Sequence, residues 1–478
     1  MEHVDVLIVG AGAAGIPAAL FASKTGARVV LADAASCAGG TFYLSSGQMS
    51  AAGTRLQAQK GIDDSPQKHF DDVMRINRNT ADPDLVRLAV ENAADTLHWL
   101  LDNGLQLLPE HPVVHFGHEP YETPRTYWAE EGGLAIWKIL RPLLEASVAA
   151  GQVDLRLDTK LSSISRNEDS VRVTLEHAGR RYEVTAGSVV LATGGYASNP
   201  ELFSELSGGK PLYGGANDYS LGQGLVAARN IGARVVNRDY YLPSFAAVPC
   251  SSAQGGYTFL TQTYPQFRQP WEVYVNSDGK RFMREDDPSV DRRERELLKL
   301  PGMRFWAIFD ESIRQTAPSF FTKHSWEEIA PRFNKDPAFQ CADSLTELAA
   351  RIDCDESTLQ HSIREFNAAI DSGLADSFGR EHRPLALKNG PFYAVEHVGW
   401  SIVGFAGLGV NAALRVVDES GDAINGLYAA GEILGMGATS GDAFTGGMSV
   451  TPAMTFGRLL GQRLAQAHSR SNQTVQIA

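Results

Sequence analysis

A glycine-rich turn at the start of the chain constrains the fold more than any other feature. Residues 4–15 read VDVLIVGAGAAG, a strand-like apolar run that leads directly into a G-x-G-x-x-G pattern. Gly10 permits a sharp turn, Gly12 permits close approach of the backbone to a pyrophosphate, and Gly15 permits close packing of helix on strand. The N-terminus of the next helix attracts phosphate through its free N–H groups and its dipole. The turn therefore predicts a dinucleotide site in an α/β domain.

Two later segments extend this prediction. A second strand, expected over residues 27–32, ends at Asp33, an acid suitably placed to bind a ribose hydroxyl. Residues 188–195 form another apolar run that ends in a glycine turn, as expected of a buried strand in a central parallel sheet. At this point the pattern is compatible with NAD and with FAD.

The length and texture of the chain predict an insertion in the nucleotide-binding domain. At 478 residues the chain exceeds what one hydrophobic core usually serves. Its glycine-rich loops stop near residue 237 and return after residue 394, and the stretch between is richer in aromatic residues, prolines and clustered charges such as 291–296. We expect a nucleotide-binding domain in two parts with an inserted substrate domain, at residues 1–236, 237–394 and 395–478.

Charge and cysteine content exclude several kinds of partner. The net charge of −13 argues against nucleic acid or an anionic membrane as the main partner, because both need a basic face. No apolar run reaches the roughly 20 residues that span a bilayer, and no charged n-region precedes the first strand, so we expect a cytoplasmic protein. The four cysteines are scattered without a C-x-x-C motif, which predicts reduced thiols and no zinc or iron–sulfur site.

Five stretches in order connect the chain to a known family. They are GAGAAG at 10–15, Gly39-Gly40 with IDDSP at 62–66, LATGG at 191–195, NSDGKRFMRE at 276–285 and GLYAAGE at 426–432. Together they resemble the soluble flavoproteins of the fumarate reductase and 3-ketosteroid (cyclic ketone) dehydrogenase type across nearly the whole chain. The resemblance implies FAD, and not NAD, as the resident cofactor.

The resemblance also implies an architecture. It is a discontinuous Rossmann-like FAD-binding domain of the α/β class, into which an α+β capping domain that closes over the flavin is inserted. In membrane-bound relatives a histidine near the Gly39-Gly40 loop attaches the flavin covalently. No histidine lies between Gly39 and Gly61 in this chain, so we expect non-covalent FAD.

Motif positions carry the FAD contacts of the family onto this chain. The resemblance places the glycine turn, Asp33 and the Gly40 loop at the diphosphate and ribose, residues 46–48 beside the flavin ring, and Glu432 at the ribityl chain. A helix that starts at Ser449 and Val450 would stabilise negative charge on the pyrimidine edge of reduced flavin. The predicted contacts are Gly10, Gly12, Ala13, Ala14, Gly15, Asp33, Ala34, Gly40, Thr41, Ser46, Gly47, Gln48, Ala192, Thr193, Gly194, Gly431, Glu432, Ser449 and Val450.

The residues that hold dicarboxylates in the fumarate reductase branch are replaced. That branch uses histidines and arginines, and bidentate arginine is the natural partner of a carboxylate. The arginine expected before Gly446-Gly447 falls on Phe444, the histidine expected before the 407–409 turn falls on Phe405, and a histidine expected within 240–249 is absent. Because a phenyl ring leaves a carboxylate unpaired in a water-poor pocket, the sequence disfavours fumarate and succinate.

The 3-ketosteroid dehydrogenase branch is matched only in part. In that branch hydride leaves the β-carbon for flavin N5, a tyrosine removes the α-proton, and a donor stabilises the enolate oxygen. Residues 452–457, PAMTFG, resemble this branch, and Gly447 aligns with the glycine whose backbone N–H polarises the ketone. One of its tyrosines aligns instead with Ser289, and the other with Ala443 or Phe444.

The catalytic acid or base is therefore open. Arg292 lies three residues after Ser289, where the fumarate reductase branch has an arginine proton donor, but it also fits a solvated member of the 291–296 cluster. Asp442 fits a turn cap, and His324 and His397 fit surface positions. Four loop tyrosines offer a phenol, although each also fits a packing role: Tyr264, Tyr241, Tyr121 and Tyr127. The residues selected as catalytic are Arg292, Tyr264, Ser289 and Gly447.

The sequence thus predicts an FAD-dependent oxidoreductase that acts on a carbon–carbon bond next to a carbonyl. Desaturation of a cyclic or hydrophobic ketone is favoured, because Phe405 and Phe444 suit an apolar ring. The enzyme alternative is an enoate reductase that holds its acid differently, through Arg292 or Arg125. The other alternative is a flavin-binding protein without turnover. The expected partners are a small-molecule substrate, a ketone in the favoured case, and an electron acceptor that the sequence does not identify.

Overall fold

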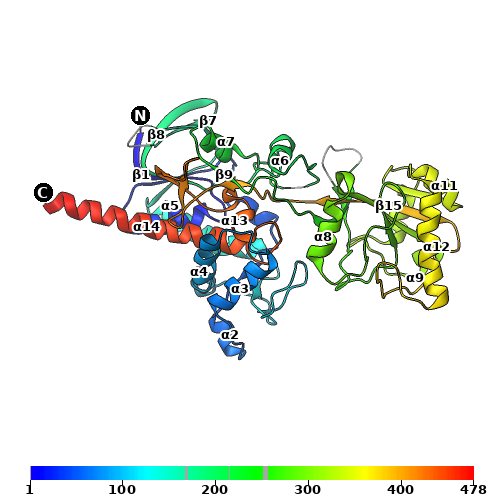
Figure 1. The fold of residues 1–478 in the computed structure, drawn as a ribbon. Coiled ribbons are helices and arrows are strands. Elements are labelled where there is room, and N and C mark those ends of the chain that lie inside the picture. Colours follow the sequence, from blue (N-terminus) through cyan, green and yellow to red (C-terminus); the bar gives the residue numbers. More distant parts are fainter. Residues whose placement is uncertain (1, 167–170, 215, 251–256, 478) are drawn as a thin grey trace. The chain divides into compact units, whose positions relative to one another are not determined.

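The structure, a computed structural model, describes residues 2–166, 171–214, 216–250 and 257–477 (Figure 1). It divides into two compact units: unit 1 is Met1–Gly209, Ala216–Tyr241 and Val403–Ala478, and unit 2 is Lys210–Gly215 and Leu242–Ile402. These boundaries differ from those predicted at 237 and 394. Residue 394 lies inside strand β15 (Phe392–Trp400), which pairs with three other strands of unit 2 and cannot be divided between units.

Unit 1 is built on an eight-stranded sheet whose main path is β17–β18–β8–β1–β2–β5. β1 lies in parallel between β2 and β8, with Val6 opposite both Val29 and Ser188. All four residues of β2 are buried, as expected where helices cover both faces of a parallel sheet. The strands are β1 (Glu2–Val9), β2 (Val29–Ala32), β5 (Val153–Arg156), β6 (Thr159–Arg166), β7 (Val171–His177), β8 (Arg180–Leu191), β17 (Arg415–Val417) and β18 (Ala423–Ala429).

The last helix of unit 1 packs on its first. α14 lies against α1 and α4 (Figure 1), and small residues allow this approach, since a Cβ on Gly457 would lie 2.1 Å from the Ala14 carbonyl oxygen. This docking brings the start of α14 to the glycine turn. The helices are α1 (Gly15–Ala22), α2 (Arg55–Gln59), α3 (Pro66–Ile76), α4 (Pro83–Asp102), α5 (Gly133–Ala149), α6 (Pro200–Leu206), α7 (Gln223–Arg229), α13 (Gly437–Ser440) and α14 (Val450–Ile477).

A short ribbon of unit 1 joins three distant segments. β3 (Met49–Ser50) pairs with β4 (Thr126–Tyr127), and the N–H of Ser50 donates to Thr451 Oγ1 at 2.9 Å. The segment after the Gly39-Gly40 loop, the loop before β4 and the start of α14 therefore meet at one place.

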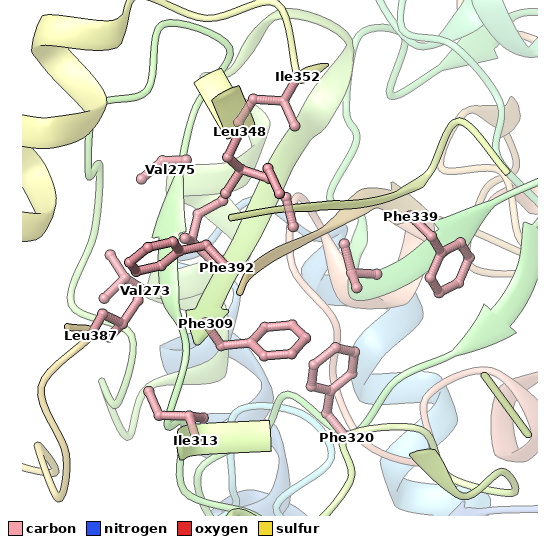
Figure 2. Packing of buried hydrophobic residues seen from close by; sticks show 14 of the residues in the cluster. Val273, Val275, Phe309, Ile313, Phe320, Phe339, Leu348, Ile352, Leu387 and Phe392 are labelled. Atoms are coloured by element: carbon pink, nitrogen blue, oxygen red, sulfur yellow. The ribbon is translucent and has the colours of Figure 1, made fainter. Parts of the chain in front are cut away.

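Unit 2 has its own antiparallel sheet, in the order β11–β10–β15–β13–β12 with β14 also paired to β15. Aromatic residues dominate its buried core, where Phe309, Phe320, Phe339 and Phe392 pack with aliphatic residues of the strands and helices (Figure 2). Its main elements are β10 (Ser244–Pro249), β11 (Tyr257–Leu260), β12 (Val273–Val275), α8 (Val290–Leu298), β13 (Arg304–Asp310), α9 (Glu311–Thr316), β14 (Phe339–Ala342), α11 (Leu345–Arg351) and α12 (Glu356–Ser372). The predicted fold class is confirmed.

Candidate active site

The glycine turn has the backbone geometry that a bound diphosphate requires. Gly10 has φ +108°, and a Cβ there would lie 2.1 Å from the Ala192 carbonyl oxygen; a Cβ on Gly15 would lie 1.7 Å from the Gly10 carbonyl oxygen. Gly12 differs, because the nearest atom to its Cβ would be the Gly40 Cα at 3.9 Å. Gly10 and Gly15 are thus needed for packing, whereas Gly12 borders open space opposite Gly40.

Asp33 fixes the turn to the end of β2. Its Oδ2 accepts from the N–H of Ala11 at 2.6 Å, and its Oδ1 accepts from the N–H of Ala35 at 2.8 Å. Burial raises the pKa of this carboxyl. Each oxygen retains a second lone pair, so the carboxylate can also accept from a ribose hydroxyl, as the sequence predicts.

Two buried oxygen atoms near the strand ends lack partners in the described part of the chain. They are Thr193 Oγ1, just after β8, and Glu432 Oε1, just after β18. Burial raises the pKa of Glu432 to about 7. A Cβ on Gly195 would lie 2.3 Å from Glu432 Oε1, and one on Gly431 would lie 3.0 Å from the Ala14 Cβ, so these segments adjoin the glycine turn. Partnerless buried oxygens beside a diphosphate turn fit the hydroxyl-rich ribityl and ribose parts of FAD.

The loop predicted beside the flavin ring is held by its neighbours. Gly40 and Thr41 begin a 3₁₀ turn over Gly40–Tyr43, and Gly47 (φ +66°) approaches the start of α5, where a Cβ would lie 2.5 Å from the Gly132 carbonyl carbon. Gln48 Nε2 lies 3.0 Å from His115 Nε2. The side chain of Ser46 is exposed. His115 belongs to a loop in which the sequence analysis identified no functional histidine.

That loop also contributes His118, whose ring stacks on Phe444 with centroids 5.1 Å apart and planes 25° apart. The ring centroids of Phe444 and Phe405 lie 5.4 Å apart, and those of Phe405 and Tyr241 lie 6.1 Å apart. His118 Nδ1 is buried with no partner in the described ranges, and burial lowers the pKa of His118 to about 4. A neutral imidazole thus lies against Phe444 and Phe405, the two positions where the resemblance to the dicarboxylate branch leads us to expect an arginine and a histidine. Spacing along the sequence gave no signal for His118.

The glycine-rich segment before α14 is fixed tightly. Gly447 has φ +75°, and a Cβ there would lie 2.4 Å from the Ser50 N, so only glycine fits. Its carbonyl oxygen accepts from the N–H of Thr451 at 3.2 Å. The exposed Ser449 and partly buried Val450 lie at the start of α14, where the sequence predicts contact with the flavin. The helix dipole there favours negative charge.

Several other candidates in unit 1 have structural partners. Arg125 is completely buried and pairs with Asp64 at 2.8 Å and Asp72 at 2.7 Å, so it cannot hold an acid without breaking a buried ion pair. Asp442 accepts from Arg78 at 3.0 Å, which ties the glycine-rich segment to the loop after α3. The hydroxyl groups of Tyr127 and Thr54 lie 2.7 Å apart.

In unit 2, Ser289 caps α8. Its Oγ accepts from the N–H of Arg292 at 3.2 Å. The Arg292 side chain is 70% exposed and pairs with Asp287 at 3.2 Å. Both residues thus have local structural roles, and their catalytic roles stay predictions.

The next residue, Arg293, is only 1% exposed. Its guanidinium lies over the Phe245 ring at 4.5 Å and near the Tyr264 ring at 5.8 Å, and it donates to the Thr263 carbonyl. Among the described residues, its Nε and Nη1 have no acceptor. Burial lowers the pKa of Arg293 and raises that of Tyr264. The structure therefore brings Tyr264 together with Arg293 and not with Arg292, a one-residue difference that helix phase decides.

One interpretation from the sequence is wrong. His397 is not a surface residue but is fully buried in β15, where its ring stacks on Phe305 at 5.0 Å and burial lowers its pKa to about 4. β15 is buried on both faces, so alternation along the strand does not expose this position. His324 contacts Glu328 at 3.8 Å with much of its side chain exposed.

Comparison with known proteins identifies the family. The profile of a family described as "FAD binding domain" matches residues 5–447. The chain is an FAD-binding flavoprotein. The fumarate reductase (cytochrome) of Shewanella frigidimarina is 30% identical to the flavoprotein over 479 residues, which cover 98% of the flavoprotein and 78% of that relative.

Two solved structures resemble the flavoprotein. One is the open conformation of a flavocytochrome c3 fumarate reductase, with a TM-score of 0.72 and 29% sequence identity. The match covers 97% of the flavoprotein and 78% of that chain. The 3-ketosteroid Δ1-dehydrogenase of Sterolibacterium denitrificans shares the fold, with a TM-score of 0.76 at 20% identity over 98% and 100% of the two chains. The predicted family, the FAD cofactor and the assignment as an FAD-dependent oxidoreductase are confirmed.

Two further observations concern the expected location. Within the described ranges, no helix of the flavoprotein has the length and apolar character needed to cross a membrane. Three of its cysteines, Cys37, Cys341 and Cys354, are free thiols.

Proposed function

We propose that the flavoprotein desaturates a cyclic or hydrophobic ketone at the carbon–carbon bond next to the carbonyl. The observation that carries this proposal is the wall formed by His118, Phe444 and Phe405, with Phe444 only 7% exposed. Apolar rings favour an apolar substrate and leave a second carboxylate without a partner. A ketone is uncharged and needs only one hydrogen-bond donor at its oxygen.

The protein groups fall into separate tasks. Bound FAD supplies the acceptor for the hydride. The N–H of Gly447 donates to the ketone oxygen and stabilises the negative charge that develops there, and the start of α14 favours negative charge nearby. We propose Tyr264, in unit 2, as the candidate base for the α-proton. Burial raises the pKa of its phenol, and the positive charge of Arg293 beside it offsets part of that rise. Arg292 and Ser289 remain alternatives for proton transfer.

A second candidate function, reduction of an enoate, rests on Arg293. A buried guanidinium with two nitrogens that lack acceptors in the described structure suits a single carboxylate, which arginine binds in a bidentate manner. One carboxylate, but not two, is then accommodated.

The decisive experiment starts from flavoprotein that has been photoreduced without oxygen. The reduced protein is mixed with 2-cyclohexenone or with cinnamate, and flavin absorbance is followed. Rapid reoxidation by the enone alone supports ketone chemistry, and rapid reoxidation by the enoate alone supports the second candidate. If neither reoxidises the flavin, a binding protein without turnover is favoured. A ketone panel with an artificial acceptor then tests the desaturating direction.

We also propose that the flavoprotein is cytoplasmic and that it uses an electron acceptor, whose identity is not part of the proposal. Free thiols at Cys37, Cys341 and Cys354 support a reducing compartment. Cell fractionation against marker enzymes of each compartment tests the location, and recovery in a periplasmic or secreted fraction contradicts it.

A further inference from the structure

The Tyr121 side chain is tied to the segment that precedes α14. Its hydroxyl donates to the Gly446 carbonyl oxygen at 2.6 Å, and the residue is 4% exposed. A second link joins the same two segments, since Glu119 and Thr445 form a parallel bridge. Burial raises the pKa of Tyr121, so its hydroxyl remains a donor at physiological pH. Tyr121 is thus a donor to the backbone and not a free phenol.

The peptide group that accepts this bond is also the one that carries the Gly447 N–H. The Gly446–Gly447 peptide is trans, so its N–H points away from the carbonyl oxygen that Tyr121 contacts. Gly447 is buried, yet none of the described residues accepts a hydrogen bond from its N–H. Buried N–H groups without acceptors are rare, and such a group marks a place for an oxygen atom from outside the chain.

We propose that Tyr121 is a positioning residue that holds and polarises the Gly446–Gly447 peptide so that the Gly447 N–H binds an oxyanion. This inference rests on the role proposed for Gly447. Hydrogen bonds in a chain strengthen one another, so donation to the carbonyl makes the N–H of the same peptide a stronger donor. The backbone of β3 also approaches this segment closely, because a Cβ on Gly447 would lie 2.4 Å from the Ser50 N.

Two variants of the FAD-loaded protein form a matched pair. Tyr121→Phe removes the hydroxyl and leaves the ring, which packs edge-on against His69 at 5.3 Å. Tyr127→Phe removes the hydroxyl of another buried tyrosine, which contacts Thr54 and not Gly446. The probe is 4-nitrophenolate, a stable oxyanion whose binding is followed by its absorbance. We expect Tyr121→Phe to weaken binding about threefold to tenfold, the range for one hydrogen bond, and Tyr127→Phe to leave it unchanged. Equal binding by the two variants, or no binding by the parent protein, overturns the proposal.

A spectroscopic measurement tests the hydrogen bond itself. Labelling with [1-¹³C]glycine and [¹⁵N]glycine selects the seven Gly-Gly linkages of the chain, of which 446–447 is one. We expect Tyr121→Phe to move one of these amide resonances that Tyr127→Phe leaves in place, because an amide nitrogen responds to hydrogen bonding at the preceding carbonyl. A spectrum in which Tyr121→Phe moves none of them overturns the proposal.

Failure of the proposed function gives a different result. If the enone does not reoxidise the reduced flavin but Tyr121→Phe still weakens 4-nitrophenolate binding, ketone chemistry is wrong and the Tyr121 role stands. If the enone reacts and the two variants bind the probe equally, ketone chemistry stands and the Tyr121 role is wrong.

Discussion

The two ends of the FAD site in unit 1 are specified in different ways. At the diphosphate end, Gly10, Gly12 and Gly15 lie within six residues and act through backbone shape. At the ring end, Gln48, His115 and Phe444 come from distant segments and act through side chains. A turn with a required backbone shape needs glycines at fixed intervals, which can be recognised in the sequence. Side chains that meet from several loops have no fixed interval between them.

The two ends of the FAD site also differ in how closely they match the motifs of the family. The diphosphate end contains the glycine turn expected of an FAD-binding domain, whereas at the ring end Phe405 and Phe444 occupy positions where the resemblance to the dicarboxylate branch implies cations. At the ring end one polar group is the backbone N–H of Gly447, and the carbonyl of the same peptide accepts from Tyr121, which belongs to the loop that also contains His115 and His118. The segment between α4 and α5 thus contributes three side chains to this end of unit 1: His115, His118 and Tyr121.

The largest expected effect is loss of the cofactor in Gly12→Val. The nearest atom to a Cβ at this position is 3.9 Å away, so the variant should fold, with its side chain in the space that a diphosphate needs. We expect purified protein with normal circular dichroism and almost no flavin absorbance. Gly10→Val is the contrast: its Cβ would meet the Ala192 carbonyl oxygen at 2.1 Å, so misfolding is expected. A fully yellow Gly12→Val protein would mean that the diphosphate binds elsewhere.

The next effect compares two neighbouring arginines in unit 2. We expect Arg293→Met to reduce turnover by about 10²-fold or more, within the range for acid–base and positioning groups, while FAD content stays normal. Removing a buried charge that has few partners should leave the melting temperature unchanged or higher. Arg292→Ala, at an exposed position paired with Asp287, should retain turnover. The reverse pattern would restore Arg292 as the proton-transfer residue.

Much of the fold was predictable because its signals are local. The strand and glycine turn at residues 4–15 predicted β1 and the start of α1, and the composition change predicted an inserted domain. The boundary predicted at residue 394 lies within β15 and not at Ile402, because residues 394–399 are all buried and a strand buried on both faces looks the same in either unit. The apolar run predicted as a strand at 188–195 is the end of a longer strand, β8, which begins at Arg180, because pairing with β1 continues through Ala186.

The substrate end was less predictable for a physical reason. Arg292 and Arg293 are adjacent in a run of charges, and only the phase of α8 decides which one is buried. His118 has no sequence partner, since its stacking on Phe444 depends on how two loops meet. Tyr121 is one of four loop tyrosines in the sequence, and only the fold shows that its hydroxyl lies 2.6 Å from the Gly446 carbonyl oxygen. Burial and convergence are tertiary properties, and spacing does not encode them.

A smaller effect is expected from the aromatic wall. Phe444→Ala removes apolar contact area from the ring end, so we expect KM for a ring-bearing ketone or enone to rise about tenfold or more, as for loss of one buried side chain. KM for a small acyclic enone should change less. Phe405→Leu is the comparison, because it keeps an apolar side chain at the more buried position of the wall, so we expect it to change the ratio of the two KM values less than Phe444→Ala does. An unchanged ratio in Phe444→Ala contradicts an apolar substrate pocket at this wall.

The smallest effect concerns the pH dependence of stability at the ribityl position. The pKa of Glu432 rises from an ordinary value near 4.5 to about 7 in the folded state because of burial. Its protonated form therefore stabilises the fold fully below pH 4.5, and that contribution is lost as the pH rises through 7. Thermal unfolding of FAD-free protein should show parent and Glu432→Gln diverging by a few degrees between pH 5 and pH 8, with the parent relatively more stable at pH 5.

The exposed Glu419→Gln variant provides the control for this measurement, since it removes one carboxyl without removing a buried one. Its melting temperature should follow that of the parent at both pH values. If Glu432→Gln also follows the parent, the carboxyl ionises normally and is hydrated in the FAD-free protein. The partnerless Oε1 would then have a water ligand, and the fit of this position to a ribityl hydroxyl would lose its electrostatic support.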